Sequence, residues 1–296
     1  MERKTYKVIC KISDGGFGEI YKVSSPSINE ILVLKHLKFR GNLNEQTYIK
    51  NEISSLSSLR HENIISFREV VVKSEEVNII MEYADGGNLE DFVSEHKTIC
   101  NTLVVDIFIQ ILKAVEFCHQ NNIAHRDITP SNVLMLRNRT IKLADFGLSM
   151  KCMSTAGHPL LCDDFLGNRL FSAPEVLRGI VHDAILADLW NLGVLLYFIM
   201  FTRTPFTGYD EEILVQQQTI GNTITTSHCI DLFQRTLLNL LKIIPCDRTC
   251  VSKLAEWFGA GGRADTDAYV FRFRRGKIAY MTYFPILEGK FPGLPS

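Results

Sequence analysis

The chain lacks an excess of charge of either sign. Its 296 residues include 32 Lys and Arg against 33 Asp and Glu, which leaves a formal net charge of −1. Such a balance gives no general attraction to nucleic acid or to anionic membranes, so we expect no nucleic-acid partner. The hydrophobic share of 46% is ample for a packed core in one two-lobed domain or two small domains.

Patterns typical of secreted and zinc-binding proteins are also missing. The eight cysteines are scattered, and Cys246 and Cys250 are the one pair with close spacing. Without a second Cys pair or a His pair, this spacing does not predict a zinc site. The N-terminal residues show no signal-peptide pattern, so we expect reduced thiols and a cytoplasmic or nuclear protein.

Long apolar runs are missing as well. The most apolar stretch covers residues 189–201 and is interrupted by the polar groups of Trp190 and Asn191. It is too short and too polar to predict a membrane span, so we expect a buried helix.

Hydrophobic periodicity divides the chain into a β-rich part and a helical part. Strand-like alternation runs through residues 6–37 and returns at 67–73 and 77–82, with a helical pattern at 45–59. Further helical patterns cover residues 89–95, 103–121, 185–201, 210–218, 229–242 and 250–258. This order predicts an α+β fold with a small antiparallel N-lobe (about 1–83) and a larger, mainly helical C-lobe (about 84–258).

Carboxylates and a carboxamide gather in a short stretch of the predicted C-lobe. A short hairpin predicted at residues 133–143 would bring Asn132 and Asp145 together at its open end. Oxygen ligands from two converging loops suit Mg²⁺. Asp127, five residues before Asn132, would then be placed to accept a proton from a hydroxyl beside a metal-bound phosphate.

These residues carry a family resemblance. His125-Arg126-Asp127, then Asn132, then Asp145-Phe146-Gly147 resemble the motifs of the eukaryotic-type protein kinases in order and spacing. The resemblance covers about residues 6–258, leaves 259–296 as a tail of unknown role, and implies a two-lobed kinase fold that uses ATP and Mg²⁺. It also implies a protein substrate with a Ser or Thr hydroxyl; the oligomeric state stays open. The implied catalytic residues are Asp127, Lys35, Asn132 and Asp145, of which Asn132 and Asp145 hold the metal.

The predicted nucleotide site begins with a glycine-rich turn between two strands. Residues 13–20 read SDGGFGEI, where glycine lets backbone N–H groups approach phosphate oxygens. The turn resembles the kinase phosphate loop, with Ser13 in place of the first glycine. Residues 80–84 resemble the hinge, whose backbone at Glu82 and Ala84 would bind adenine, so that side-chain identity there would matter little. The implied nucleotide contacts are Ile12, Gly15, Gly16, Phe17, Gly18, Ile20, Val33, Lys35, Met81, Glu82, Ala84 and Leu134.

Two ion pairs are expected to organise the site. Lys35 ends a strand, as does the kinase lysine that contacts the α- and β-phosphates, and Glu52 is its expected partner, with Glu45 as the alternative. Arg126 stands where related enzymes meet an activation-loop phosphate. Asp163 and Asp164 lie in the matching part of this chain, and we expect them to pair with Arg126 without phosphorylation.

The chain departs from the family at two interacting positions. Thr129 replaces a lysine that normally neutralises the transferring phosphate, and Asn168 replaces a threonine that normally contacts that lysine. Arg169 is a candidate source of the missing charge. These changes keep a pseudokinase or nucleotide-binding scaffold open as the alternative, and a small-molecule kinase is a third possibility. Pro130 and the segment 167–175 resemble the serine/threonine class rather than the tyrosine class.

Structural roles follow from the same resemblance. Asp188 would orient the backbone of the loop that carries Asp127, and Arg248 would form a buried ion pair with Glu175. Beyond the kinase-like region, residues 269–284 interleave aromatic and basic side chains. This pattern is compatible with nucleic-acid binding, but a segment packed on its own domain is favoured.

Overall fold

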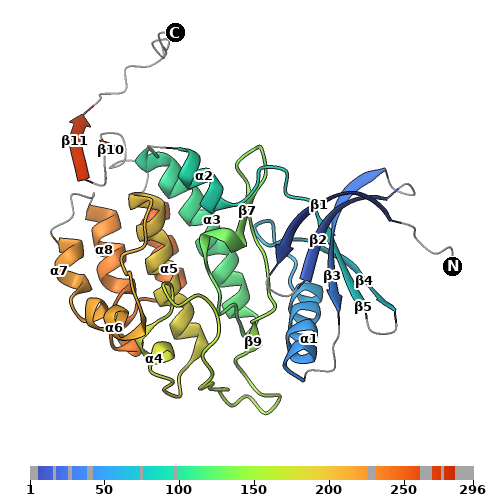
Figure 1. The fold of residues 1–296 in the computed structure, drawn as a ribbon. Helices are drawn as coiled ribbons and strands as arrows, with labels where there is room; N and C mark the ends of the chain where they lie inside the picture. The colour runs from blue at the N-terminus through green and yellow to red at the C-terminus, as the bar shows by residue number, and fades with distance from the viewer. Residues whose placement is uncertain are drawn as a thin grey trace, which may run out of the picture.

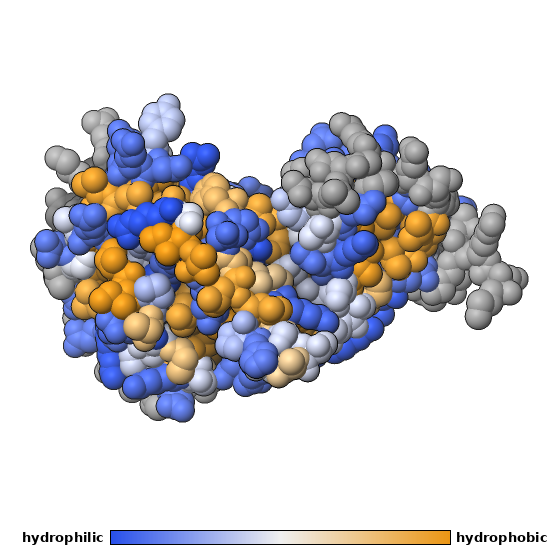
Figure 2. Space-filling view, turned by 90° about the horizontal axis from the view of Figure 1, so that it is seen from below, coloured by the Kyte–Doolittle hydropathy of each residue, from blue (hydrophilic) through white to orange (hydrophobic). Residues whose placement is uncertain are grey.

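A computed structural model describes residues 6–15, 18–25, 29–38, 43–73, 76–96, 99–225, 231–260, 269–274 and 277–283. The chain forms a sheet lobe and a larger helical lobe joined by one connection at residues 83–88 (Figure 1). The predicted α+β, two-lobed architecture is confirmed. Seen from below, hydrophobic and hydrophilic side chains are interspersed over the face of the helical lobe (Figure 2).

The N-lobe is a five-stranded antiparallel sheet with one helix against it. Its strand order is β1-β2-β3-β5-β4. The elements are β1 (Lys7–Gly15), β2 (Gly18–Ser25), β3 (Glu30–Lys38), α1 (Leu43–Ser58), β4 (Phe67–Lys73) and β5 (Glu76–Glu82). The central strand β3 pairs Lys35 with Ile20 on one side and Ile79 on the other, so that Lys35 is held from both neighbouring strands.

The C-lobe is built mainly from helices. Its longer helices are α2 (Leu89–Glu95), α3 (Asn101–Gln120), α5 (Ala184–Phe201), α6 (Asp210–Gln218), α8 (Asp231–Leu240) and α9 (Val251–Ala260). Asn88 caps α2, since its side chain accepts a hydrogen bond from the Asp91 N–H at 2.8 Å. The cap satisfies an otherwise unpaired backbone donor and sets where the helix begins.

The core of the C-lobe forms around α3 and α5. Helix α9 packs on α3, and α8 packs on α5. Within the described residues, α5 alone is long and apolar enough to cross a membrane, and 89% of that window is buried inside the protein. The helix begins at Ala184, before the apolar run at 189–201, so the shortness of that run does not by itself exclude a membrane span. The expectation that it is buried was right, and it is a core helix of this lobe.

Short strands frame the loop that carries Asp127. β6 (Ile123–Ala124) pairs with β9 (Met150–Lys151), and β7 (Val133–Met135) pairs with β8 (Ile141–Leu143). A single 3₁₀ turn, η1 (Pro130–Asn132), lies between them. The two strand pairs hold both ends of the loop 125–132, which we call the catalytic loop.

The periodicity missed the shortest elements. Helices α4 (Pro174–Leu177) and α7 (Ile220–Thr225), the turn η2 (Pro245–Asp247) and the β6–β9 pair have too few residues to show a repeat. In the tail, β10 (Tyr269–Arg274) pairs with β11 (Lys277–Tyr283). The favoured packing of the tail and the domain boundary at 258 stay predictions.

Candidate active site

Three charged groups meet between the lobes. The Nζ atom of Lys35 lies 2.7 Å from Oε1 of Glu52 on α1 and 2.8 Å from Oδ1 of Asp145 after β8. Lys35 and Glu52 are 4% and 2% exposed, so each charge depends on the other for compensation. Glu52, rather than Glu45, is therefore the partner of Lys35 in this structure.

The pKa shifts in this cluster follow from burial and from the ion pairs. Burial alone would lower the pKa of Lys35, but the charges of Glu52 and Asp145 outweigh it and raise that pKa. Burial would raise the pKa of Asp145, and Lys35 reverses this, so the pKa of Asp145 is lowered. At neutral pH the ammonium and the Asp145 carboxylate are both charged.

Two residues of the site, Arg126 and Asp145, have strained backbone conformations, and Asp188 supports the backbone at Arg126. Arg126 and Asp145 have φ values of 69° and 62°, in the left-handed region that non-glycine residues rarely adopt. The carboxylate of Asp188, fully buried on α5, accepts hydrogen bonds at 2.8 Å from the backbone N–H of His125 and of Arg126. Asp188 thus holds the catalytic loop as expected.

His125 joins the catalytic loop to the segment of Asp145. Its Nε2 donates to the carbonyl oxygen of Ala144 at 3.0 Å, and its ring meets the buried ring of Phe146 edge-on at 4.6 Å between centroids. Because a carbonyl only accepts, Nε2 carries the proton and Nδ1 is left to accept from the Asp127 N–H at 3.3 Å. One imidazole therefore orients residues on both sides of the site.

Asp127 and Asn132 form the second polar pair. The Nδ2 group of Asn132 donates to Oδ2 of Asp127 at 2.7 Å and to its backbone oxygen at 2.9 Å. These bonds fix the amide orientation and leave Oδ1 of Asn132 as the free oxygen ligand. The Ala144 N–H donates to the Asn132 carbonyl at 2.9 Å, which brings Asn132 beside the Asp145 segment. Burial raises the pKa of Asp127 above its ordinary value.

The donor set fits magnesium. Within the described ranges, no group of three or more His, Cys, Asp or Glu side chains can hold a metal by itself. Mg²⁺ typically takes only one or two protein oxygens and completes its shell with water and phosphate. One carboxylate, Asp145, and one amide oxygen, Asn132, match that preference.

The proposed nucleotide contacts line the facing elements of the N-lobe and the connection. Val33 pairs with Met81 across β3 and β5, and Leu134 lies on β7 of the C-lobe. Gly18 is required by packing, since a Cβ there would lie 2.3 Å from the backbone oxygen of His36. Gly15 pairs with Gly18, whereas Gly16 and Phe17 lie outside the described residues. Ile12 on β1 is 48% exposed.

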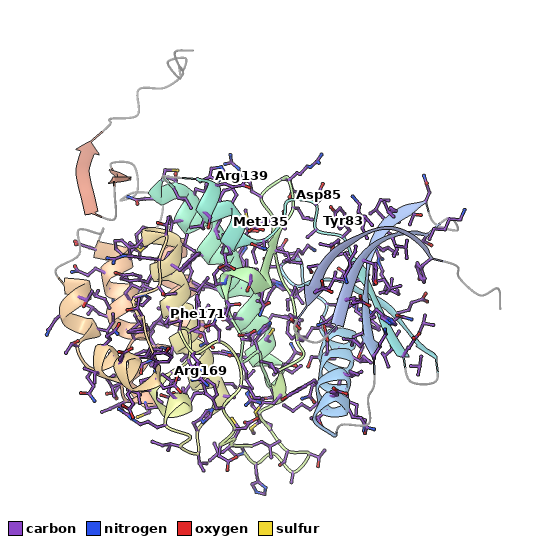
Figure 3. The ribbon with its side chains drawn as sticks, viewed as in Figure 1. Tyr83, Asp85, Met135, Arg139, Arg169 and Phe171 are labelled. Carbon is purple, nitrogen blue, oxygen red and sulfur yellow. The ribbon has the colours of Figure 1, made fainter. Side chains whose placement is uncertain are left out.

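The connection between the lobes is held by side chains that the sequence did not single out. In Figure 3, Tyr83 and Asp85 lie between the lobes, and Met135 lies near Asp85. Oε1 of Glu82 accepts from the Ser66 N–H at 2.7 Å and from Lys142 Nζ at 2.9 Å. The Glu82 side chain therefore has a structural role of its own, while the expectation that its backbone binds adenine stays a prediction. No spacing rule links these positions, because they meet only after three segments converge.

The two family departures make no hydrogen bond to each other among the described residues. Thr129 Oγ1 bonds with Ser131 Oγ at 3.1 Å, while Oδ1 of Asn168 accepts from the Leu170 N–H at 3.0 Å. The guanidinium of Arg169 pairs with Asp210 on α6 at 2.9 Å. It is therefore engaged outside the Asp127 site, and the suggestion that it replaces the missing lysine charge was wrong.

The segment 145–175, called here the activation segment, is joined to the catalytic loop. Gly167 has φ of 95°, and a Cβ there would lie 2.9 Å from the Arg126 carbonyl oxygen. The next backbone N–H, of Asn168, donates to Oδ1 of Asp127 at 3.3 Å. At the end of the segment, both oxygens of Glu175 accept from the buried guanidinium of Arg248, as expected.

Comparisons with known proteins agree with this geometry. The model of the protein kinase domain family matches residues 6–253. NUAK family SNF1-like kinase 2 from Homo sapiens is 35% identical over 221 residues, which cover 74% of this chain and 34% of the relative. The carbon catabolite-derepressing protein kinase of Candida glabrata is 31% identical over 263 residues, covering 86% and 41%.

A plant relative extends the match. CBL-interacting serine/threonine-protein kinase 16 from Arabidopsis thaliana is 30% identical over 272 residues, covering 86% of this chain and 56% of the relative. The chain thus spans between 34% and 56% of the length of these relatives. A family model across most of the chain, together with these relatives, shows that the chain belongs to the protein kinase domain family.

Proposed function

We propose that this chain is a serine/threonine protein kinase that transfers the γ-phosphate of ATP to a protein hydroxyl with Mg²⁺. One observation carries the proposal. Lys35, Asp145 and the catalytic-loop residues Asp127 and Asn132 come from three different segments and form two polar pairs, Lys35–Asp145 at 2.8 Å and Asn132–Asp127 at 2.7 Å. The hydrogen bond from the Ala144 N–H to the Asn132 carbonyl joins the two pairs. Phosphoryl transfer depends mostly on such positioning and on charge neutralisation rather than on covalent protein chemistry.

Each residue has a distinct role in this proposal. Asp145 and Oδ1 of Asn132 hold Mg²⁺, which when bound neutralises charge on the phosphate oxygens. The Lys35 ammonium, kept charged by its two carboxylate neighbours, contacts the α- and β-phosphates. Asp127 accepts the proton of the substrate hydroxyl, and its raised pKa brings it closer to the range of an effective base.

The nucleotide base would lie between the lobes. The backbone of Glu82 and Ala84 binds the adenine edge, and Ile12, Ile20, Val33 and Leu134 supply apolar contacts on its faces. Met81, 8% exposed, closes the back of the site. The backbone N–H groups of Gly15 and Gly18 approach the phosphates, and the contacts expected of Gly16 and Phe17 rest on the sequence alone.

A protein hydroxyl of the Ser/Thr class is the favoured acceptor. Two of the relatives carry serine/threonine or SNF1-like kinase in their names, and all three are named as kinases. The pseudokinase alternative is not supported by these relatives. Thr129 and Asn168 remain unusual, but the groups assigned to metal, phosphate and proton are all present.

The test is phosphate transfer from labelled Mg-ATP to generic Ser/Thr and Tyr peptides. Asp145→Asn is the control, because it keeps the shape of the side chain and removes its charge. We expect transfer to Ser or Thr that disappears in the control. Nucleotide binding without any transfer by the unmodified chain would overturn the proposal.

A further inference from the structure

Two buried serines link helix α1 to the segment that carries Asp145. Oγ of Ser55 on α1 lies 2.8 Å from Oγ of Ser149, and Ser149 Oγ lies 2.6 Å from the carbonyl oxygen of Phe146. Ser55 and Ser149 are 6% and 0% exposed. Burial at this level makes each hydroxyl dependent on a protein partner.

The direction of the hydrogen bonds follows from chemistry. The Phe146 carbonyl can only accept, so Ser149 donates its single hydroxyl proton to it. Ser55 must then donate to Ser149. The result is a directed chain, Ser55 to Ser149 to Phe146, which we call the serine relay.

The relay is a second attachment between the same two segments. The first attachment runs from Glu52 through Lys35 to Asp145. Glu52 and Ser55 are three residues apart on α1 and therefore lie on one face of the helix. Asp145 and Ser149 lie on either side of Phe146. Two separated attachments determine the orientation of a segment, whereas one attachment sets only a distance.

Asp145 needs such support. Its φ of 62° is strained, and strained backbones persist only where the surroundings over-determine them. The Ser149 N–H also donates to the Phe146 carbonyl at 3.1 Å, which closes a tight turn directly after Asp145. The relay ties this turn to α1.

We propose that Ser55 and Ser149 are positioning residues for the magnesium ligand Asp145. The inference rests on the proposed kinase function for its meaning, although its test also has a readout independent of phosphate transfer. The relay couples the placement of α1 to the orientation of the Asp145 carboxylate. Loss of either hydroxyl loosens that carboxylate without altering the adenine contacts.

The experiment compares Ser55→Ala, Ser149→Ala and the double variant with the unmodified chain. Ser57→Ala is the matched control, because Ser57 is on the same helix but exposed and bonds only to the Ser54 carbonyl. For each protein we would measure ADP affinity by calorimetry with and without Mg²⁺, the Mg²⁺ requirement of phosphate transfer, and the free energy of unfolding.

In the unmodified chain, Mg²⁺ should increase the affinity for ADP. We expect this increase to be about tenfold smaller in both single variants and in the double variant. ADP binding without Mg²⁺ should stay unchanged, as should every property of Ser57→Ala. Ser149→Ala leaves the buried Ser55 hydroxyl without its acceptor, whereas in Ser55→Ala the Ser149 hydroxyl still donates to Phe146. The double variant removes the unpartnered Ser55 hydroxyl, so it should regain stability relative to Ser149→Ala. Its Mg²⁺ response should nevertheless remain weak.

A double variant that regains both stability and Mg²⁺ response would overturn the inference, since the relay would then only fill space. Single variants with an unchanged Mg²⁺ response would overturn it as well. If the unmodified chain transfers no phosphate, the proposed function fails, while Mg²⁺-dependent ADP binding still decides the role of the relay.

Discussion

The guanidinium of Arg126 in the catalytic loop lies 2.5 Å from the carboxylate of Asp164 in the activation segment. The Arg126 side chain is only 10% exposed, so its charge is compensated mainly by this contact. The pair joins the two segments with unmodified side chains. If Arg126 is the arginine that meets an activation-segment phosphate in related kinases, as the family resemblance implies, a fixed carboxylate takes the role of that phosphate here.

This pairing predicts activity without activation-segment phosphorylation. Asp164→Asn should lower kcat roughly 10- to 100-fold, because a charge-assisted hydrogen bond to a poorly exposed guanidinium is lost. Asp163→Asn, a change at the exposed neighbouring carboxylate, is the control and should have little effect. Steady-state kinetics before and after phosphatase treatment provide the measurement. Complete loss of activity on dephosphorylation would contradict this prediction.

The raised pKa of Asp127 predicts opposite effects of pH on activity and stability. Burial disfavours the ionised form, so the folded state binds a proton more tightly than the unfolded chain does. Activity needs the ionised form of Asp127. As the pH is lowered, activity should therefore be lost at a higher pH than it would be with an aspartate of ordinary pKa. The contribution of protonated Asp127 to the free energy of unfolding is fully present below the pKa that Asp127 has in the unfolded chain. It is lost as the pH rises through the pKa that Asp127 has in the folded protein.

The variant Asp127→Asn separates these effects. It should abolish transfer, and it should be more stable than the unmodified chain above the folded pKa of Asp127. Thermal unfolding of both proteins from about pH 4 to pH 7 would measure the difference, which should grow as the pH rises. A constant difference across this range would show that the ionisation of Asp127 does not oppose folding.

The Glu175–Arg248 pair predicts a large effect on stability. Arg248 is 5% exposed and Glu175 is 6% exposed, so removing one partner leaves a buried charge uncompensated. Arg248→Met should lower the free energy of unfolding by about 3–5 kcal/mol. Arg169→Met breaks the Arg169–Asp210 pair, in which the Arg169 side chain is 59% exposed.

That second variant is the control for the buried pair and should change stability by less than about 1 kcal/mol. Urea unfolding of the two variants against the unmodified chain would measure both. Equal losses would mean that burial does not decide the contribution of these ion pairs.

Thr129 predicts a gain of rate on substitution. A lysine at this position would add a positive charge near the transferring phosphate, and one preorganised donor typically contributes about 10²–10³ in rate. We expect Thr129→Lys, alone or with Asn168→Thr, to raise kcat by at least about tenfold. Ser131→Lys adds the same charge at an exposed position of the same loop and is the control. A decrease in kcat with an intact fold would show that the loop has adapted to threonine.

Local pattern was sufficient for the longer elements and for the identity of the central residues. The predicted helix at 103–121 matches α3, and that at 250–258 matches α9, because apolar side chains recur along one face of each. Lys35, Glu52, Asp127, Asn132 and Asp145 were identified from motif order and spacing. Those motifs constrain a chain strongly, since the chemistry needs each residue type at its own place.

Contacts between distant segments were beyond the reach of any such pattern. Arg169 was expected near the transferring phosphate but pairs with Asp210, since the path of its loop turns the side chain toward α6. Glu82, Lys142 and Ser66 meet because β5, β8 and the chain between α1 and β4 converge. An isolated lysine or serine in a sequence carries no sign of its partner.

The amino-acid sequence by itself therefore determined which chemical groups the site contains and which segments carry them. Only the tertiary structure decided how these groups are oriented relative to one another. The relay from Ser55 through Ser149 to Phe146 and the left-handed backbone of Asp145 exist only when α1 packs against the segment after β8. The physical reason is that hydrogen bonds and buried ion pairs act over a few ångströms, and only the tertiary structure brings residues 94 positions apart to that distance.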